Sequence, residues 1–227
     1  MASYEGYLHE SGRWARERAE SERSRLVQHL AEQRRIQSAI VLDAIGLVPR
    51  ERFVPASLES EAYADRALPI ALEQTISQPY IVALMTDLAG ASPGQRVLEI
   101  GTGCGYQTAV LAATGAEVFS VEILEPLARE AAARLRSLGV HAHLRIGDGY
   151  RGWPECAPFD AIVVTAAPPD VPHALLDQLA PGGRLVIPVG PEDGDQELLL
   201  VRRERGGDVV ERVAPVRFVP MTGGDTH

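Results

Sequence analysis

The sequence predicts an α/β fold built on a mostly parallel sheet. From Pro93 onward, short runs rich in β-branched and apolar residues alternate with segments of helical length. Such alternation is typical of βαβ units, in which helices cover the faces of a parallel sheet. The alternation ends near Gln196, where two β-rich runs joined by a glycine turn predict antiparallel strands at one edge of the sheet.

Each element of this pattern has a place in the chain. The predicted parallel strands are Arg96–Ile100, Glu117–Val121, His143–Ile146, Phe159–Val164 and Arg184–Val189. The predicted helices are Tyr80–Ala89, Tyr106–Ala113, Pro126–Leu138 and Val171–Leu179. The predicted antiparallel strands are Gln196–Arg203 and Val209–Val219, on either side of Gly206 and Gly207. We therefore expect a doubly wound sheet with antiparallel C-terminal strands.

An N-terminal helical extension precedes this pattern. The stretch from about Ser11 to Ile45 is densely charged at first and then acquires apolar residues at helical spacing. We expect a solvated helical arm that merges into a docked helix. Prolines bracket the segment Val48–Pro55, which predicts an extended connector. The expected organisation is a helical arm over residues 1–46 and one domain over residues 47–227.

Composition and charge exclude several classes of function. The 227 residues carry 22 Lys and Arg against 31 Asp and Glu, a formal net charge of −9. This charge argues against a nucleic-acid-binding surface, which needs clustered cations. The sequence has no apolar run of about 18 residues for a membrane span and no apolar signal core at its start. Cys104 and Cys156 have neither zinc-ligand nor disulfide-framework spacing. We expect a cytoplasmic protein without metal, membrane or nucleic-acid partners, and a monomer or weak dimer.

The segment from Val97 to Tyr106 has the pattern of a cofactor-binding loop. It reads VLEIGTGCGY, a buried strand that runs through three alternating glycines into a helix. Glycines permit a tight turn and close approach of a ligand to the main chain, and the helix N-terminus offers unpaired N–H groups. Dinucleotide loops read GxGxxG, whereas this loop reads GxGxG directly after Glu99. That carboxylate would repel a pyrophosphate and suits an ammonium or sulfonium group.

Two further carboxylates follow the next predicted strands. Glu122 ends the second strand, where it can accept hydrogen bonds from both ribose hydroxyls, and Asp148 follows the third, within reach of an adenine amino group. Parallel strands end along one rim of the sheet, which is where open α/β sheets bind ligands. Together with Glu99, these acids predict an S-adenosylmethionine pocket and a Rossmann-like, S-adenosylmethionine-dependent methyltransferase fold.

Other motifs occur in a fixed order around this loop. They are Leu68-Pro69-Ile70, Gln74-Thr75-Ile76-Ser77-Gln78-Pro79-Tyr80, Gly147-Asp148-Gly149, Pro158-Phe159-Asp160-Ala161-Ile162, Thr165-Ala166-Ala167-Pro168, Pro181-Gly182-Gly183-Arg184-Leu185, Pro188-Val189-Gly190 and Val216-Arg217-Phe218-Val219-Pro220. With them, the chain from about Val48 to Thr222 resembles the protein-L-isoaspartate (D-aspartate) O-methyltransferase family. The Thr-Ile-Ser-Gln-Pro motif is specific to that family, whereas most S-adenosylmethionine methyltransferases share the glycine loop.

The resemblance implies methyl transfer from S-adenosylmethionine to the free α-carboxylate of L-isoaspartyl residues, or to the side-chain carboxylate of D-aspartyl residues. The ester then closes to a succinimide that hydrolyses partly to normal aspartate, so the enzyme initiates protein repair. Ser77 corresponds to the family's active-site serine. The implied cofactor contacts are Thr75, Glu99, Gly101, Thr102, Gly103, Glu122, Ile123, Gly147, Asp148, Gly149 and Thr222. The implied peptide contacts are Ile76, Ala167, Pro168, Val219 and Pro220.

A serine suits this reaction as a positioning group. A carboxylate with a pKa of about 4 is already ionised at neutral pH, so no strong general base is required. The site must instead align the reacting atoms and remove water from the acceptor oxygen. We therefore assign Ser77 to orientation of the acceptor and not to nucleophilic attack. The alternative is that Ser77 caps the helix that begins near Pro79.

Four alternatives to the repair enzyme are weighed from the same residues. Ala71-Leu72-Glu73 replaces a glycine-rich stretch of the family, and the N-terminal arm is long; both features allow a relative that methylates aspartate in one dedicated peptide. A catalytically idle binding module is disfavoured by the intact Ser77 and acidic residues. A nucleic-acid methyltransferase is disfavoured by the charge and by the absence of an Asn/Asp-Pro-Pro-aromatic motif at Thr165–Pro168. The loop spacing disfavours an NAD-dependent enzyme.

Overall fold

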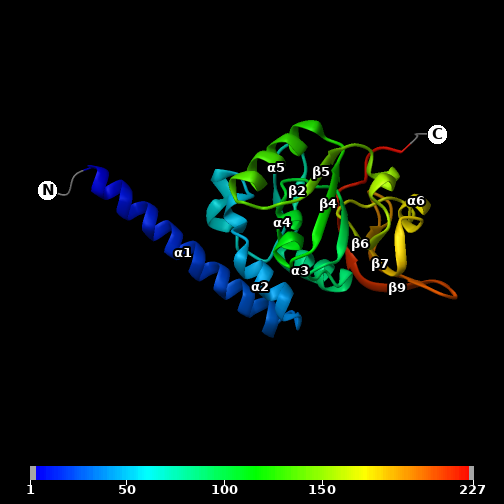
Figure 1. Cartoon of the computed structure of the whole chain (residues 1–227). Helices are drawn as coiled ribbons and strands as arrows, with labels where there is room; N and C mark the ends of the chain where they lie inside the picture. Colours follow the sequence, from blue (N-terminus) through cyan, green and yellow to red (C-terminus); the bar gives the residue numbers. More distant parts are fainter. Residues whose placement is uncertain (1–3, 225–227) are drawn as a thin grey trace.

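A seven-stranded sheet forms the centre of the molecule (Figure 1). The computed structural model describes residues 4–224, and side chains from residue 17 onward. The strand order is β5-β4-β3-β6-β7-β8-β9. The strands are β3 (Arg96–Ile100), β4 (Glu117–Glu122), β5 (His143–Ile146), β6 (Phe159–Val164), β7 (Leu179–Val189), β8 (Gln196–Glu204) and β9 (Gly207–Val216). The first five in this order pair in parallel, and β8 pairs antiparallel with both β7 and β9.

Helices cover both faces of this sheet because successive strand residues point to opposite sides. The helices are α1 (Tyr4–Glu32), α2 (Ala39–Leu47), α3 (Pro79–Ala89), α4 (Tyr106–Ala113), α5 (Glu125–Ser137) and α6 (His173–Leu176). Val97 of β3 packs in one cluster with Met85 of α3 and Leu111 of α4. The next residue, Leu98, packs in a cluster with Leu175 of α6 on the other face. The predicted doubly wound, mostly parallel fold is confirmed.

The prediction for the segment before β7 was wrong in part. The sequence predicted a helix over Val171–Leu179, but α6 spans only His173–Leu176 and β7 already begins at Leu179. Leu179 pairs with Phe159 of β6, and a register shift follows before the regular pairing from Arg184 onward. Strand pairing with a buried neighbour therefore overrides the helical pattern of the last residues.

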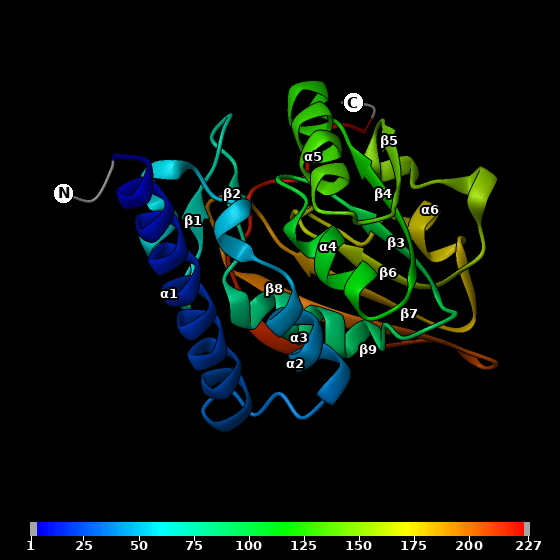
Figure 2. The ribbon, with the colours of Figure 1, turned by 60° about the vertical axis from the view of Figure 1, so that its left-hand side comes forward.

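The N-terminal extension is interrupted rather than continuous. The backbone between α1 and α2 reverses direction, with Arg35 in the left-handed region at φ 58°. Leu26 and Leu30 near the end of α1 and Ile36 after it are buried in one cluster with Phe53 and Tyr106. Figure 1 shows α1 standing away from the body toward its N-terminal end. Figure 2 shows it beside α2 and the hairpin of β1 (Leu68–Pro69) and β2 (Thr75–Ile76). The division at residues 46 and 47 stays a prediction, and the last turns of α1 belong to the core.

The connector after α2 is not simply extended, contrary to the prediction. A short 3-10 helix, η1 (Arg50–Arg52), follows Pro49. The side chain of Arg50 is fully buried, its Nε donates to the Ala62 carbonyl at 2.8 Å, and its guanidinium lies 4.8 Å from the centre of the Tyr106 ring. The contact of the Arg50 cation with the face of the Tyr106 ring holds this segment against the core.

None of the helices in the described residues combines the length and the hydropathy that a membrane span requires.

We predict that Leu30→Ala destabilises the protein by about 2–5 kcal/mol, because it leaves a cavity where α1 joins the core. The measurement is urea unfolding followed by circular dichroism. Leu47→Ala is the matched control, since Leu47 is 69% exposed at the end of α2; we expect a change within about 0.5 kcal/mol. Equal effects of the two substitutions would show that the end of α1 is not part of the cooperative core.

Candidate active site

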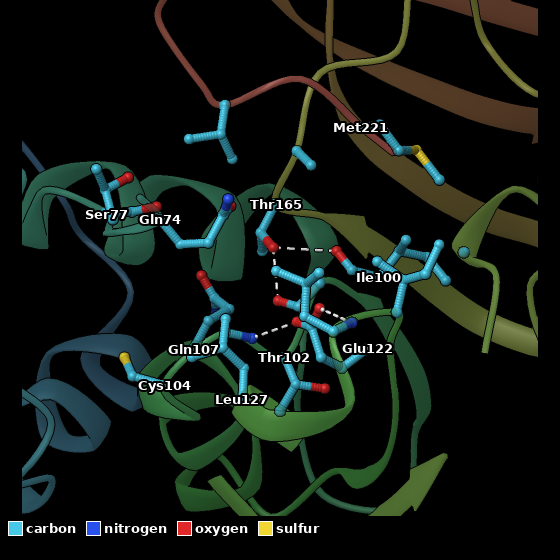
Figure 3. A pocket seen from close by; sticks show the side chains of 18 of the residues that line it. Gln74, Ser77, Ile100, Thr102, Cys104, Gln107, Glu122, Leu127, Thr165 and Met221 are labelled. Carbon is cyan, nitrogen blue, oxygen red and sulfur yellow. Dashed lines mark hydrogen bonds between the residues drawn. The ribbon is translucent and has the colours of Figure 1, made fainter. Parts of the chain in front are cut away.

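A cavity lies at the carboxyl ends of β3, β4 and β6 (Figure 3). One wall comes from the segment that links the β1–β2 hairpin, of strands Leu68–Pro69 and Thr75–Ile76, to α3. The residues after β9 close another side. Of the predicted site residues, twelve line it: Thr75, Ile76, Ser77, Gly101, Thr102, Gly103, Glu122, Ile123, Gly149, Val219, Pro220 and Thr222. The structure therefore brings the glycine loop, the Ser77 segment and the C-terminal segment around one space.

The glycine loop approaches the neighbouring strand too closely for any side chain at Gly101. Gly101 has a positive φ of 95°, and a Cβ atom there would collide with Oγ1 of Thr165. That hydroxyl donates to the carbonyl of Gly101 at 2.6 Å and to the carbonyl of Ile100 at 3.0 Å. The end of β6 thus fixes the start of the loop, and Thr165 also lines the cavity.

Glu122 connects the glycine loop to the end of β4. Its Oε2 accepts from the backbone N–H of Gly103 at 2.8 Å, and its Oε1 accepts from the N–H of Leu124 at 2.9 Å. The residue is 6% exposed and lines the cavity. Each carboxylate oxygen has more than one lone pair, so both retain capacity for a ligand hydroxyl.

Glu99 does not line this cavity. It is fully buried below the loop, where Oε2 accepts from Oγ1 of Thr108 at 2.5 Å and from Oγ of Ser120 at 2.6 Å. Ser120 in turn shares a hydrogen bond of 2.6 Å with Thr102 of the loop. Burial raises the pKa of Glu99 to about 8, although the two hydroxyl donors lower it. A direct contact of Glu99 with the cofactor stays a prediction; its observed partners support the loop from beneath.

Asp148 also lies outside the cavity lining, as does Gly147, while Gly149 lines it. Oδ1 of Asp148 accepts from the N–H of Tyr150, and Oδ2 accepts from the N–H of Gly224 in the C-terminal segment. The carboxylate thus ties the segment after Thr222 to the turn after β5. Its contact with an adenine group stays a prediction.

The hydroxyl of Ser77 has no hydrogen-bond partner within residues 17–224. The position that caps α3 is held by Gln78, whose side chain makes no capping bond. The N–H of Tyr80 at the start of α3 is instead accepted by Oδ1 of Asp65 at 2.9 Å. The alternative role of Ser77 as a helix cap therefore has no support, and its hydroxyl is available at the cavity wall (Figure 3).

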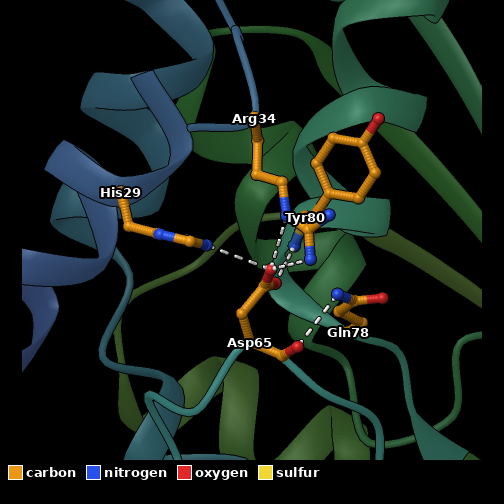
Figure 4. Close-up of polar contacts among 5 residues, drawn as sticks. All are labelled: His29, Arg34, Asp65, Gln78 and Tyr80. Atoms are coloured by element: carbon orange, nitrogen blue, oxygen red, sulfur yellow. Dashed lines mark hydrogen bonds and ion pairs between the residues drawn. The ribbon is translucent and has the colours of Figure 1, made fainter. Parts of the chain in front are cut away.

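Asp65 links the start of α3 to the end of α1 and the residues after it (Figure 4). Its backbone carbonyl accepts from Nε2 of Gln78 at 2.9 Å. Its carboxylate lies 2.9 Å from Nη2 of Arg34 and 3.4 Å from Nε2 of His29. The guanidinium of Arg34 also lies 4.8 Å from the centre of the Tyr80 ring. The segment that carries Ser77 is consequently anchored to the end of α1 and the residues after it.

Two predicted peptide contacts, Ala167 and Pro168, are buried and do not line the cavity. Ala167 pairs with the C-terminal segment, since its N–H donates to the carbonyl of Val219 and its carbonyl accepts from the N–H of Met221. This pairing presents Val219 and Pro220 to the cavity, where Ala166 also lies. The role of Ala167 seen here is to place that segment.

Several lining residues escaped the sequence analysis. They were given no role in the site, and they are Gln74, Val82, Ile100, Cys104, Tyr106, Gln107, Val121, Leu124, Leu127, Thr165 and Met221. Most are apolar residues at strand ends or in helices, and the sequence pattern does not distinguish them from residues of the hydrophobic core. Thr165 alone carried a signal, because it directly follows a buried strand at the predicted ligand rim.

Comparison with known proteins identifies the family. The sequence model described as protein-L-isoaspartate(D-aspartate) O-methyltransferase matches residues 21–226. The chain belongs to this family. A protein-L-isoaspartate O-methyltransferase of Opitutus terrae is 55% identical over 210 residues, covering 92% of this chain and 90% of that protein. The corresponding protein of Gloeobacter violaceus is 54% identical over 190 residues, covering 83% and 93%.

Solved structures agree with the sequence matches. A structure of a protein-L-isoaspartate O-methyltransferase has a TM-score of 0.79 at 31% identity, covering 89% of this chain and 66% of that one. A Plasmodium falciparum protein described as the same enzyme, solved with S-adenosyl-L-homocysteine, has a TM-score of 0.77 at 25% identity and covers 88% and 98%. The predicted family, methyltransferase class and S-adenosylmethionine cofactor are confirmed. The idle binding module and the NAD-dependent enzyme are set aside.

The raised pKa of Glu99 predicts a pH-dependent stability. The folded protein retains this proton between about pH 4.5 and 8, whereas the unfolded chain releases it. Stability from this group therefore falls as pH rises through that window, by at most about 1.4 kcal/mol per pH unit. We expect Glu99→Gln to reduce that slope in urea unfolding measured from pH 5.5 to 8. Glu59→Gln, at an exposed position, is the control, and identical slopes for wild type and Glu99→Gln would contradict the assignment.

Proposed function

We propose that the cavity holds S-adenosylmethionine against the glycine loop and Glu122, and that Ser77 orients the carboxylate of an isoaspartyl residue beside it. The observation that carries this proposal is the free hydroxyl of Ser77 on the cavity wall opposite the loop (Figure 3). The repair of isoaspartyl and D-aspartyl damage by methylation is the activity of the family to which the chain belongs.

The residues of the cavity suit this cofactor. Glu122 would accept from the ribose hydroxyls, and the loop from Gly101 to Gly103 allows close approach of the main chain. Ile123 and Leu127 offer apolar surface for an adenine ring. When bound, S-adenosylmethionine supplies a methyl group activated by its sulfonium. Glu99 and Asp148 would act indirectly, by holding the loop and the C-terminal segment in place.

The acceptor side of the cavity has the properties that a carboxylate acceptor needs. Among the lining residues that the structure describes, Glu122 carries the only charged side chain. None of these residues would therefore neutralise the acceptor carboxylate with a positive charge. A carboxylate is ionised without help at neutral pH. The hydroxyl of Ser77 can donate one hydrogen bond that fixes the carboxylate, while Ile76, Val219 and Pro220 exclude water from it.

The product of this reaction rearranges without further catalysis. Attack of the neighbouring backbone nitrogen on the methyl ester closes a succinimide and releases methanol. Hydrolysis of the succinimide gives a mixture that includes normal aspartate, so repeated cycles deplete the isoaspartyl form.

The decisive assay is transfer of a labelled methyl group from S-adenosylmethionine to a synthetic peptide with L-isoaspartate, beside the same peptide with normal aspartate. Transfer to the isoaspartyl form alone would support the repair function. Transfer to normal aspartate alone would support the relative with one dedicated peptide. Cofactor binding without transfer to either peptide would contradict the proposal.

We predict that Ser77→Ala lowers turnover by about 10–100-fold, because the acceptor loses its orienting donor. Binding of S-adenosylhomocysteine, measured by isothermal titration calorimetry, should change by less than about twofold, since the loop and Glu122 are unaltered. Ser60→Ala, at an exposed position away from the cavity, is the matched control. Unchanged turnover in Ser77→Ala would eliminate the positioning role.

A further inference from the structure

A second hollow meets the cofactor cavity at Ser77. Its volume is about 410 Å³, and it shares Thr75 and Ser77 with the cavity described above. Its other walls come from Ala67 before the hairpin, Ile81 of α3, and the chain from Pro215 to Phe218 at the end of β9. An acceptor residue placed at Ser77 therefore has a groove beside it for the peptide chain on one of its flanks.

Among the described residues that line this groove, Arg217 is the only charged one. Its side chain is exposed. It forms no ion pair or hydrogen bond with any other residue from 17 to 224. Arginines on the two strands that precede Arg217 are paired, with Arg202 of β8 bound to Glu211 and Arg212 of β9 bound to Glu197. An unpaired guanidinium in an otherwise neutral groove is a recognition element for a carboxylate.

We propose that this groove receives the peptide flank of the acceptor and that Arg217 binds a second carboxylate there, in addition to the one that is methylated. The second carboxylate comes either from an acidic side chain near the isoaspartyl residue or from the C-terminus of a short peptide. The inference rests on the function proposed above, since it takes Ser77 as the place of the acceptor.

Because the protein has a net negative charge, the positive charge of Arg217 matters for the binding of an acidic peptide. A formal charge of −9 disfavours approach of an acidic peptide from any direction. Arg217 provides local attraction at the groove. Because the side chain is exposed, the pair is screened by salt and its contribution is modest. We therefore expect the effect in KM rather than in kcat, and we expect it to fade as ionic strength rises.

The experiment compares isoaspartyl peptides that differ by one charge. Glutamate or glutamine is placed in turn at each position flanking the isoaspartyl residue, and each peptide is made with a free or an amidated C-terminus. For the wild-type enzyme at low salt, we expect one acidic position, or the free C-terminus, to lower KM by about two- to fivefold. The arm that responds identifies the source of the carboxylate.

The variants test whether Arg217 causes this preference. In Arg217→Gln the ratio of KM values for the neutral and acidic peptides should fall to about one, and Arg217→Lys should retain most of it. Arg205→Gln is the matched control, since Arg205 is exposed in the turn between β8 and β9 and should keep the wild-type ratio. A KM ratio near one in the wild type would overturn the inference, and so would an unchanged KM ratio in Arg217→Gln. In both cases, turnover of the neutral peptide would leave the proposed function intact. Absence of turnover with every peptide would overturn both.

Discussion

The hydrogen bond from the Gly103 N–H to the Glu122 carboxylate sets the geometry of the whole site. It joins a loop that follows β3 to the last residue of β4, and the adjacent N–H of Leu124 binds the other oxygen of the same carboxylate. A carboxylate held by two backbone donors keeps its orientation. The parallel sheet is required for this bond, because only parallel strands end at the same rim. The Ser77 segment and the residues after β9 complete the walls of the cavity around this edge of the sheet.

A second carboxylate, that of Asp65, fixes the segment that carries Ser77. It caps the start of α3 through the N–H of Tyr80 and is itself held by Arg34 and His29 (Figure 4). Because Asp65 accepts from the N–H of Tyr80 at the helix end, the hydroxyl of Ser77 remains free for the proposed acceptor. The buried residues at the end of α1 supply the rigid support for this arrangement, since Leu30 packs in the same cluster as Ile76. The N-terminal extension thus supports the segment that carries Ser77.

The parts of this architecture that depend on local pattern were predictable, and those that depend on tertiary contact were not. Four of the predicted elements, including β3 and α4, have the predicted bounds, because buried strands and short helices separated by turn residues carry a clear period. The burial of Arg50 had no local signal, since it arises from the Tyr106 ring far along the chain. The positions of Glu99 and Asp148 relative to the cavity depend on which way each side chain leaves its strand end. For Glu99, Thr108 of α4 and Ser120 of β4 decide this.

The distribution of charge around Ser77 explains how one site handles a cationic cofactor and an anionic acceptor. In the proposed complex the negative charge of Glu122 lies on the cofactor side, where it would accept hydrogen bonds from ribose hydroxyls. A cation beside the acceptor oxygen would stabilise the ground-state carboxylate and make it a weaker nucleophile. The cavity lining, over residues 17–224, includes no cationic side chain. A hydroxyl orients the oxygen at a smaller cost in reactivity. Arg217 lies in the neighbouring groove and not in the cofactor cavity, so it can attract an acidic peptide without quenching the oxygen that accepts the methyl group.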